Sequence, residues 1–358
     1  MNYYIHEAQL NSEDQKMAAV KARDDVEVIL KDEGMQELDI VFKLGDRENG
    51  SMTQKLKGHR DAYRLWEEEL KQLKAGDTLY IQFPVLCHTL FFAKLVKKLE
   101  KRGVKVVAII HDLEILRWSR LSNNSFKFKV RTELEEKSVL KACSKIIVHN
   151  SKMKDYLAEL GIEKEKMALL EIFDYLIPDY DEERMNQRDQ QREEAVLIAG
   201  NLKKHKAGYA YELPDNYSFH LYGIGFDGET NDKILYKGSF LPDELPYALD
   251  GSFGLIWDGE SAKTCQGVYG EYLRYNNPHK TSLYLASNIP VIIWKEAALA
   301  DFVLENQCGI VVDSLWDIEK EVSKLSKEDY DSLCAGAQKV GEKLRKGYFL
   351  REAVKKAK

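Results

Sequence analysis

The first residues that could do chemistry lie in the stretch NNPHKTSLYLASNIPVII, residues 276–293. Pro278 precedes a run with helical periodicity, and Lys280, Thr281 and Ser282 would occupy the first turn of that helix. The unpaired backbone N–H groups of a helix start attract an anion, and a lysine and two hydroxyls would add to that attraction. The same pattern also suits a capped helix that packs on a sheet through Leu283, Leu285 and Ala286. The spacing alone leaves both interpretations open.

A second basic stretch, AGNLKKHKAGY at residues 199–209, follows a predicted strand. Gly200 would let the backbone approach an anion, and a lysine of this stretch would supply a mobile positive charge for a phosphate. The stretch lacks the pattern G-x-x-x-x-G-K-[ST], so it predicts no P-loop. A surface turn with solvated lysines is the simpler interpretation of this stretch taken alone.

Two further motifs carry little weight. The stretch YGIGFDG, residues 222–228, lacks G-x-G-x-x-G and favours an irregular loop over a dinucleotide site. Asp179 and Asp181 form a D-x-D pattern of the kind that binds a metal-held nucleotide sugar. They lie in an acidic segment away from any predicted strand end, so we interpret the pattern as chance.

Acidic residues that could act as a base follow predicted strands of the first half. His111 and Asp112 end the buried stretch VKVVAIIHD, where such a pair could orient an acceptor or take a proton from its hydroxyl. A structural histidine with an aspartate that caps a helix fits the same residues. Asp174, in IFDYLIP, has the same two interpretations.

Composition excludes several classes of protein. The chain has 358 residues, of which 44% are hydrophobic and 31% charged, so it is long enough for two ordinary globular domains. The net charge of −6 and the absence of a lysine–arginine block argue against a nucleic-acid ligand. Five scattered cysteines without C-x-x-C spacing predict neither a zinc site nor a disulfide framework. With no signal-like or membrane-spanning stretch in the sequence, we expect a cytoplasmic protein.

The elements that position these residues alternate between strands and helices. Short apolar strands separated by helices of 10 to 15 residues predict an α/β protein with parallel, doubly wound sheets. The charged stretch after Pro178 reads as a linker between two such halves. The predicted organisation is a first domain at 1–178, a linker at 179–194, a second domain at 195–335 and a last helix at 336–358.

Ligands of doubly wound sheets bind beyond the carboxyl ends of the strands. That rule turns the predicted strands into two sets of candidate residues. The first half contributes Glu7, Gln82, His111, Asp112, Asn150 and Asp174. The second half contributes Gly200, Asn201, Tyr222, Gly223, Asp258, Gly259 and Trp294.

Several segments resemble the bacterial glucosyltransferase 3 family, including its beta-1,6-galactofuranosyltransferases. The most specific is YNNPHKTSLYLA followed by IPVIIW, and AIIHD, VHNSKM, EIFDYLIP, GIVVDSLWDI and LRKGYF add to it along the whole chain. The resemblance implies a GT-B fold with two Rossmann-like domains facing a central cleft. It also implies that the second domain binds a UDP-sugar and that the last helix crosses back to the first domain.

The resemblance implies roles for individual residues. Lys280 matches a lysine that contacts the donor diphosphate, and Lys204, with Lys203 as the alternative, matches a basic position that is arginine in glucosyltransferase 3. Tyr222 matches a tyrosine near the uridine. Other donor-site residues lie in segments that match the family, namely Gly200, Asn201, Asp258, Gly259, Glu271, Thr281 and Ser282.

The expected reaction follows from the charge of the leaving group. UDP gains negative charge as the sugar leaves, and without a metal that charge must be stabilised by lysines and a helix start. We therefore expect no metal and no cofactor besides the UDP-sugar substrate. The chain lacks the E-x7-E arrangement of many retaining GT-B enzymes, which favours inversion. An inverting reaction needs a base, for which Asp112 is the first candidate, followed by Glu7 and Asp174.

The acceptor is expected to be a glycan of a cell-surface polysaccharide or glycoconjugate, either polyprenyl-phosphate-linked or on a glycoprotein. Residues 113–131 mix cations with Trp118, Phe126 and Phe128, so they could contact the inner face of a membrane, or form an ordinary solvated loop. A homo-oligomer is also compatible with the sequence. The alternative function is a non-catalytic UDP-sugar-binding or scaffold protein of the same fold. An epimerase is not supported, because Y-x-x-x-K with G-x-x-G-x-x-G is missing.

Overall fold

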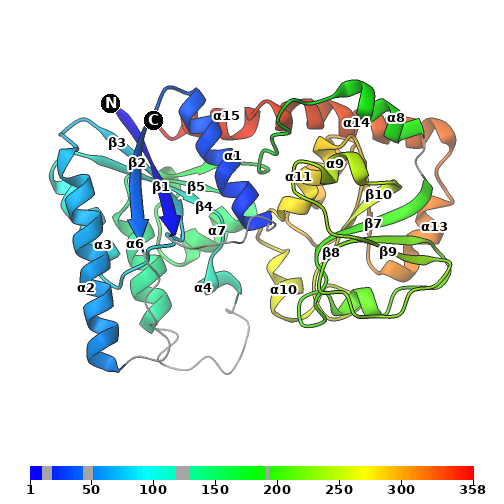
Figure 1. The fold of residues 1–358 in the computed structure, drawn as a ribbon, viewed down its shortest axis with the longest axis horizontal. Helices are drawn as coiled ribbons and strands as arrows, with labels where there is room; N and C mark the ends of the chain where they lie inside the picture. Colours follow the sequence, from blue (N-terminus) through cyan, green and yellow to red (C-terminus); the bar gives the residue numbers. More distant parts are fainter. Residues whose placement is uncertain (10–17, 43–50, 118–129, 191–192) are drawn as a thin grey trace. The chain divides into compact units, whose positions relative to one another are not determined.

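A computed structural model describes residues 1–9, 18–42, 51–117, 130–190 and 193–358 (Figure 1). The described chain forms two compact units. The first comprises residues 1–9, Val26–Leu170 and Arg351–Lys358, and the second comprises residues 18–25 and Glu171–Leu350. The first unit thus ends at Leu170, earlier than the boundary expected at residue 178, and the last eight residues group with it.

The first unit is built on a parallel sheet of six described strands in the order β2-β1-β3-β4-β5-β6. Its central strands are buried on both faces, as a sheet covered by helices on each side requires. Figure 1 shows the helices α2 and α3 next to each other. In chain order the strands and helices are β1 (Asn2–Gln9), α1 (Ala18–Asp32), β2 (Gln36–Phe42), α2 (Met52–Glu69), β3 (Thr78–Phe83), α3 (Phe92–Lys101), β4 (Lys105–Ile110), α4 (Glu114–Arg117), a π-helical turn (Glu133–Lys137), α6 (Ser138–Ala142), β5 (Lys145–Val148), α7 (Ser151–Glu159) and β6 (Met167–Leu169).

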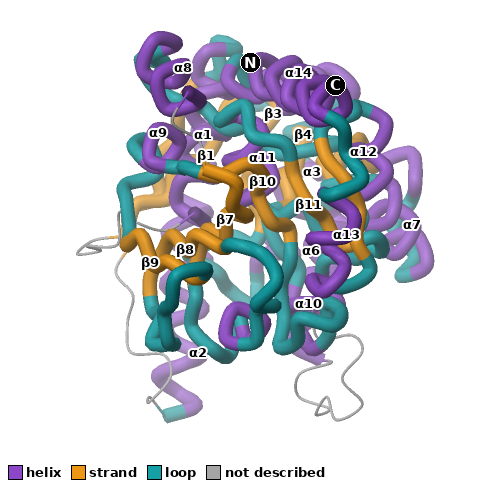
Figure 2. The backbone as a smooth tube through the Cα atoms, turned by 90° about the vertical axis from the view of Figure 1, so that its right-hand side faces the viewer, coloured by secondary structure: helices purple, strands orange, loops and turns teal. Residues whose placement is uncertain are grey.

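The second unit holds another parallel sheet of six described strands, in the order β12-β11-β10-β7-β8-β9. Figure 2 shows β9, β8, β7, β10 and β11 in turn across this sheet. Its elements are α8 (Glu182–Gln190), β7 (Glu193–Asn201), β8 (Phe219–Ile224), β9 (Ile234–Gly238), α9 (Leu245–Ala248), β10 (Gly251–Ile256), α10 (Gly267–Tyr272), α11 (His279–Ala286), β11 (Val291–Trp294), α12 (Ala300–Glu305), β12 (Gly309–Val312), α13 (Ile318–Val322) and α14 (Lys327–Arg345); α15 (Tyr348–Lys356) follows and ends in the first unit.

The segment expected to be a linker contains the helix α8. Met185 is fully buried, and Arg188 donates hydrogen bonds to the carbonyl oxygens of Pro246 and Ser287 at 2.7 and 2.6 Å. Only one apolar side chain anchors this helix, so its sequence shows no apolar periodicity. The buried guanidinium replaces the missing apolar contacts, because its hydrogen bonds to two carbonyl groups compensate for its removal from water.

Helix α11 lies unusually close to its neighbours. It packs on β10, where a Cβ on Gly254 would lie 2.1 Å from Cγ of Tyr284, and on α14, where a Cβ on Gly341 would lie 2.3 Å from the carbonyl oxygen of Leu285. The Tyr284 hydroxyl accepts a hydrogen bond from the amide of Ala199 and donates one to the carbonyl of Leu197. These contacts fix the helix against the middle of the sheet.

Candidate active site

The predicted donor residues of the second unit meet at the carboxyl edge of its sheet. The loop after β7 joins the loop after β10 through a parallel bridge between Ala207 and Gly259. The amide of Gly259 donates to the carbonyl of Lys206 at 3.2 Å. Gly259 has φ +109°, and a Cβ there would lie 2.3 Å from the carbonyl oxygen of Gln266. Only glycine suits this position, so the join between the loops depends on it.

The side chain of Lys280, in the first turn of α11, reaches the end of β10. Its ammonium group donates to the carbonyl oxygen of Trp257 at 2.8 Å and to Asp258 Oδ1 at 2.9 Å. The side chains of Lys280 and Asp258 are only 17% and 14% exposed, so the ion pair is partly shielded from water. The structure therefore brings together two predicted site residues, and Asp258 orients the lysine.

Two other predicted residues of α11 do not lie at an exposed site. Thr281 and Ser282 are fully buried. Ser282 donates its hydroxyl hydrogen bond to the carbonyl of Phe173 at 2.6 Å, and the amide of Thr281 donates to the carbonyl of Pro278 at 2.9 Å. The expectation that both hydroxyls face an anion is not met, because this helix is packed on all sides rather than along one face.

The start of α11 is bonded to the segment after β6 instead. Asn277 donates to the carbonyl of Glu171 at 3.0 Å, and the His279 ring stacks on Tyr175 at 5.0 Å between ring centroids. Burial lowers the pKa of His279 to about 4, so this imidazole is neutral at physiological pH. These contacts hold the helix start in place without using its lysine.

The loop after β7 carries exposed lysines on a structured base. Gly200 and Gly223 face each other across β7 and β8 with φ of +133° and +140°, and a Cβ on Gly223 would lie 1.8 Å from the carbonyl oxygen of Gly200. Asn201 accepts a hydrogen bond from the amide of Lys203 at 3.1 Å. Lys204 Nζ lies 5.7 Å from the ring centroid of Tyr211. The loop therefore presents Lys203 and Lys204 at the edge, both exposed.

Tyr222 is not at the edge. Its side chain is buried, and its hydroxyl donates to Asp250 and lies 3.1 Å from the carbonyl of Ala248. Both faces of β8 are buried at this position, so the side chain belongs to the core. The ring that was expected near a uridine thus packs in the core of the second unit.

One cation of the edge was missed in the sequence. Arg274 follows α10, pairs with Glu271 at 2.9 Å and with Glu296, and lies over the ring of Trp294 at 4.6 Å. Trp294 ends β11, so this guanidinium extends the row of cations after β7 and β10. The three-residue spacing of Glu271 and Arg274 was the available signal, although it is also common on helix surfaces.

The acidic candidates of the first unit are held in different ways. Glu7 Oε1 accepts the amide hydrogen of Cys87 at 2.7 Å, and Asp112 Oδ1 lies 2.9 Å from Arg117 Nη2. His111 follows β4, and its Nε2 lies 2.7 Å from Gln82 Oε1. The sequence thus placed His111 and Gln82 correctly at neighbouring strand ends.

The segment after His111 is fixed by a buried carboxylate. Glu136, in the π-helical turn, accepts hydrogen bonds from the amides of Glu114 and Ile115 at 2.7 and 2.8 Å. Burial raises the pKa of Glu136 to about 7 despite these hydrogen bonds. The start of α4 therefore depends on a group that titrates near neutrality.

Two other predicted residues, and Asp181 of the D-x-D pattern, serve as helix caps. Asp174 does not end a strand, since β6 stops at Leu169; its carboxylate accepts the amide hydrogens of Phe349 and Leu350 at 3.1 and 2.7 Å. Asn150 caps α7 through the amide of Met153 at 3.0 Å. Asp181, of the D-x-D pattern, accepts the amide hydrogen of Arg184 at 2.9 Å at the start of α8. The geometry of these residues is that of structural caps.

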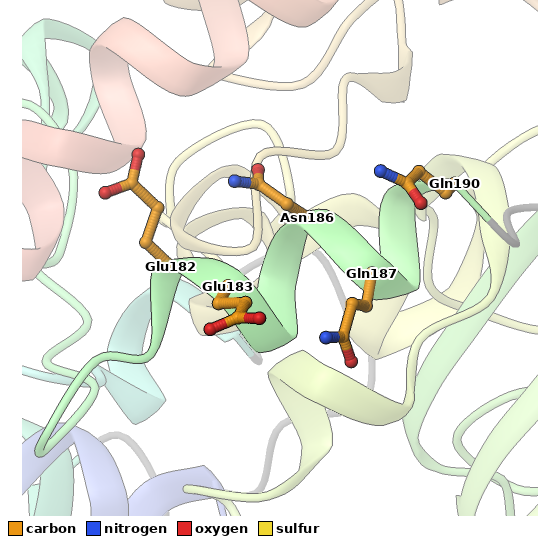
Figure 3. Close-up of a pocket in the computed structure, with 5 residues that line it drawn as sticks. All are labelled: Glu182, Glu183, Asn186, Gln187 and Gln190. Carbon is orange, nitrogen blue, oxygen red and sulfur yellow. The ribbon is translucent and has the colours of Figure 1, made fainter.

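A surface hollow is lined by residues of α8, none of which is among the candidate site residues. Figure 3 shows Glu182, Glu183, Asn186, Gln187 and Gln190, all from this one helix. It offers carboxylates and amides but no cation. In the described part of the chain, no cluster of three or more histidine, cysteine or acidic residues could hold a metal ion.

No helix in the described ranges has both the length and the apolar character that a membrane span requires. Of the predicted membrane-contact stretch 113–131, residues 118–129 lie outside the described part, including Trp118, Phe126 and Phe128.

Comparisons with known proteins agree with this architecture. Residues 2–172 match the N-terminal domain and residues 196–357 the C-terminal domain of the Glucosyltransferase 3-like family. The chain is 36% identical to the Beta-1,6-galactofuranosyltransferase WbbI of Escherichia coli (strain K12) over 290 residues, which are 79% of each chain. It is 24% identical to Glucosyltransferase 3 of Streptococcus gordonii, over 94% of this chain and 92% of the relative.

Solved structures share the fold at low sequence identity. Anabaena Alr3699/HepE in complex with UDP has a TM-score of 0.59 at 12% identity and covers 99% of this chain and 100% of its own. WaaG, a glycosyltransferase of lipopolysaccharide biosynthesis, has a TM-score of 0.55 at 11% identity over 99% of this chain and 98% of its own. These likenesses and the two parallel sheets identify the GT-B architecture with two Rossmann-like units. The chain therefore belongs to the Glucosyltransferase 3-like family of glycosyltransferases.

Proposed function

We propose that this chain transfers a sugar from a UDP-sugar to a glycan, with galactofuranose as the favoured sugar and glucose as the next. The row of cations at the carboxyl edge of the second sheet, with Lys280 held at the end of β10, carries the proposal. The relative at 36% identity, a galactofuranosyltransferase, supports the choice of sugar over the relatives at 24% and 25%, both Glucosyltransferase 3.

The donor diphosphate is proposed to bind to Lys280 and to the exposed lysines of the loop after β7. A bound diphosphate would share Lys280 with Asp258, which holds the ammonium in position beforehand. As the bond between the sugar and UDP breaks, the added charge on the leaving oxygen would strengthen these contacts, and this difference between ground and transition state accelerates the reaction. Four charged or hydrogen-bonding groups are involved in this scheme, namely Lys203, Lys204, Asp258 and Lys280.

The transfer is proposed to invert the anomeric centre and to need no metal. The D-x-D carboxylate Asp181 caps α8, so in this scheme the compensation of diphosphate charge comes from lysines. The base is proposed to come from the His111–Asp112 pair after β4, with Asp112 as the first candidate. Glu7 and Asp174 are weaker candidates, because each carboxylate accepts backbone amide hydrogen bonds.

The acceptor is proposed to be a polyprenyl-phosphate-linked or protein-linked glycan of a cell-surface polysaccharide or glycoconjugate. The proposal also includes contact with a membrane surface and self-association. A transfer assay tests neither of them. Vesicle flotation and the mass in solution would test them separately.

A donor screen tests the function. UDP release would be measured with UDP-galactofuranose, UDP-glucose and other UDP-sugars in the presence of lipid-linked oligosaccharides, with and without EDTA. We expect release from UDP-galactofuranose above the others and no effect of EDTA. Loss of UDP release on chelation would contradict the metal-free scheme. UDP binding without transfer from any donor would instead support the non-catalytic alternative.

A further inference from the structure

Four polar side chains of the first unit form one hydrogen-bonded chain. It starts at His6 on β1, whose Nδ1 lies 2.6 Å from Glu27 Oε2 on α1. Glu27 Oε1 accepts a hydrogen bond from Gln82 Nε2 on β3 at 3.1 Å, and Gln82 Oε1 lies 2.7 Å from His111 Nε2 after β4. The strands β1 and β3, the helix α1 and the residue after β4 therefore contribute to a single path that reaches His111.

The chemistry of the groups gives this path a direction. An ionised carboxylate can only accept hydrogen bonds, so the atom of Gln82 that faces Glu27 must be the amide nitrogen. The amide oxygen of Gln82 must then face His111, and an oxygen can only accept. The imidazole nitrogen next to it, Nε2, must therefore carry a proton.

The surroundings hold the side chains of Glu27 and Gln82 in place. The Gln82 side chain is buried and the Glu27 side chain is 17% exposed, so neither amide nor carboxylate can turn freely toward water. Burial acts to lower the pKa of His6, but the hydrogen bond and the charge of Glu27 raise it above its ordinary value. A protonated His6 in turn favours the charged form of Glu27.

We propose that Gln82, oriented by Glu27, is a positioning residue that keeps the proton of neutral His111 on Nε2 and makes Nδ1 the basic nitrogen of the ring. A neutral imidazole has one N–H and one lone pair, so fixing the proton on Nε2 places the lone pair on Nδ1. The position of the proton is a property of the fold and does not depend on any substrate.

Its use in catalysis rests on the proposed function. In the transfer, the acceptor oxygen forms a bond to the anomeric carbon while the bond from that carbon to UDP breaks, and its electron pair leaves with UDP. The hydroxyl proton passes to Nδ1 of His111, which in this scheme takes the place of Asp112 as the base of the pair. The resulting imidazolium keeps its Nε2–H on Gln82 Oε1, and the network back to Glu27 stabilises its positive charge.

Nitrogen NMR of the ¹⁵N-histidine-labelled protein tests the proton position directly. The protein has eight histidines, and the His111 signals would be assigned by their loss in His111→Gln. We expect the neutral His111 ring to be protonated on Nε2. A ring protonated on Nδ1 in the wild type would overturn the proposal without any variant having to fold.

Two variants of Gln82 test whether this residue determines which nitrogen of His111 carries the proton. In Gln82→Lys the ammonium can pair with Glu27 but can only donate to His111, so we expect the proton to move to Nδ1. Gln82→Met has a similar length but no hydrogen bond, so we expect both tautomers. Unchanged signals of the buried His149 and the partly buried His279 would show that each variant is folded. A folded Gln82→Lys protein that keeps its His111 proton on Nε2 would overturn the role of Gln82.

Transfer kinetics link the proton to catalysis. Gln82→Lys should lower kcat at least ~10-fold with an unchanged KM for the donor, since general-base catalysis contributes about 10²- to 10⁴-fold. Gln82→Met should lie between this variant and the wild type. A Gln82→Lys protein with its proton on Nδ1 and full kcat would refute the catalytic use. If the wild type transfers no sugar, the proposed function fails, and the NMR result still decides the position of the proton.

Discussion

Lys280 and Asp258 form a partly buried ion pair, with 2.9 Å between Nζ and Oδ1, at the carboxyl end of β10. The carboxylate neutralises the lysine while no ligand is bound. A diphosphate must therefore compete with Asp258, or share the ammonium with it. Replacing only one partner of such a pair leaves the other charge without its counterpart. Comparing both single variants with the double variant separates the contribution of each residue to ligand binding.

Lys280→Ala should lower kcat/KM at least ~10-fold, because a charge-assisted hydrogen bond to phosphate contributes on the order of 1.5–3 kcal/mol. The Asp258 carboxylate, left alone, would also repel the diphosphate. Calorimetric titration with UDP measures the loss of affinity, and steady-state kinetics measure the loss of kcat/KM. The double variant Lys280→Ala/Asp258→Asn should recover part of the lost UDP affinity. Full activity of Lys280→Ala, or a loss that follows its thermal unfolding, would contradict a role at the donor.

Thr281→Val should leave the protein as stable or stabilise it by up to about 1 kcal/mol. The Thr281 hydroxyl is fully buried, and Oγ1 has no hydrogen-bond partner in the described part of the chain. Replacing an unsatisfied polar group with an apolar one of the same shape removes its desolvation cost. Thermal unfolding measures the effect. A clear destabilisation would mean that the hydroxyl has a hydrogen-bond partner in solution and would contradict this prediction.

Asp250→Asn should destabilise the second unit by roughly 2–4 kcal/mol. Burial would raise the pKa of Asp250, but hydrogen bonds from His220, Lys237 and Tyr222 lower it below its ordinary value. A lowered pKa in the folded state means that this stabilisation is present above the unfolded pKa of about 4 and is lost as the pH falls further.

Asp313→Asn is the matched control for this change. Asp313 pairs with Lys295 at 3.2 Å, but both side chains are more than half exposed, so its loss should change the stability by less than about 0.5 kcal/mol. Urea unfolding at pH 7 compares the two variants. Equal effects would show that the Asp250 cluster is no stronger than a surface ion pair.

Glu136 should make the wild type less stable as the pH rises from about 4.5 to 7. Burial raises its pKa to about 7, whereas the unfolded chain releases this proton near 4.5. Between these values the folded state binds more protons than the unfolded state, so the free energy of unfolding falls with pH, by up to about 3 kcal/mol. Glu136→Gln removes this fall. Calorimetric melting at pH 5, 6, 7 and 8 measures it.

Glu133→Gln is the control on the same turn, because Glu133 is exposed and pairs with Lys137 at 3.0 Å. This variant should follow the wild-type dependence on pH. If Glu136→Gln also follows it, the buried carboxylate does not titrate in this range.

The residues at the carboxyl edge of the second sheet could be predicted from the sequence, because the carboxyl ends of parallel strands lie at the same edge of a sheet. The sequence placed Asn201, Asp258 and Gly259 at strand ends and Lys280 at a helix start, and the structure joins the loops after β7 and β10 through the Ala207–Gly259 bridge. The alternation of elements was sufficient for this inference, since the carboxyl ends of β7 and β10 are neighbours in the sheet.

The orientation of single side chains was not predictable in the same way. Tyr222, Thr281 and Ser282 lie on elements that are buried on every side, so no apolar pattern distinguishes a core position from an exposed one. Asp174 was misplaced because the apolar residues Ile172 and Phe173 continue the pattern of β6, although strand pairing stops at Leu169. Pairing between strands is not encoded in a local pattern.

Two glycines that pack against α11, on β10 and on α14, determine how far Lys280 extends toward the β10 loop. Gly254 and Gly341 let the helix pack at separations that a single methyl group would enlarge, so a side chain at either position would displace the helix from the β10 loop. A hydrogen bond weakens steeply over such displacements. Donor affinity should therefore depend on two positions that carry no charge and no side chain, and substitutions there would resemble the loss of the lysine itself.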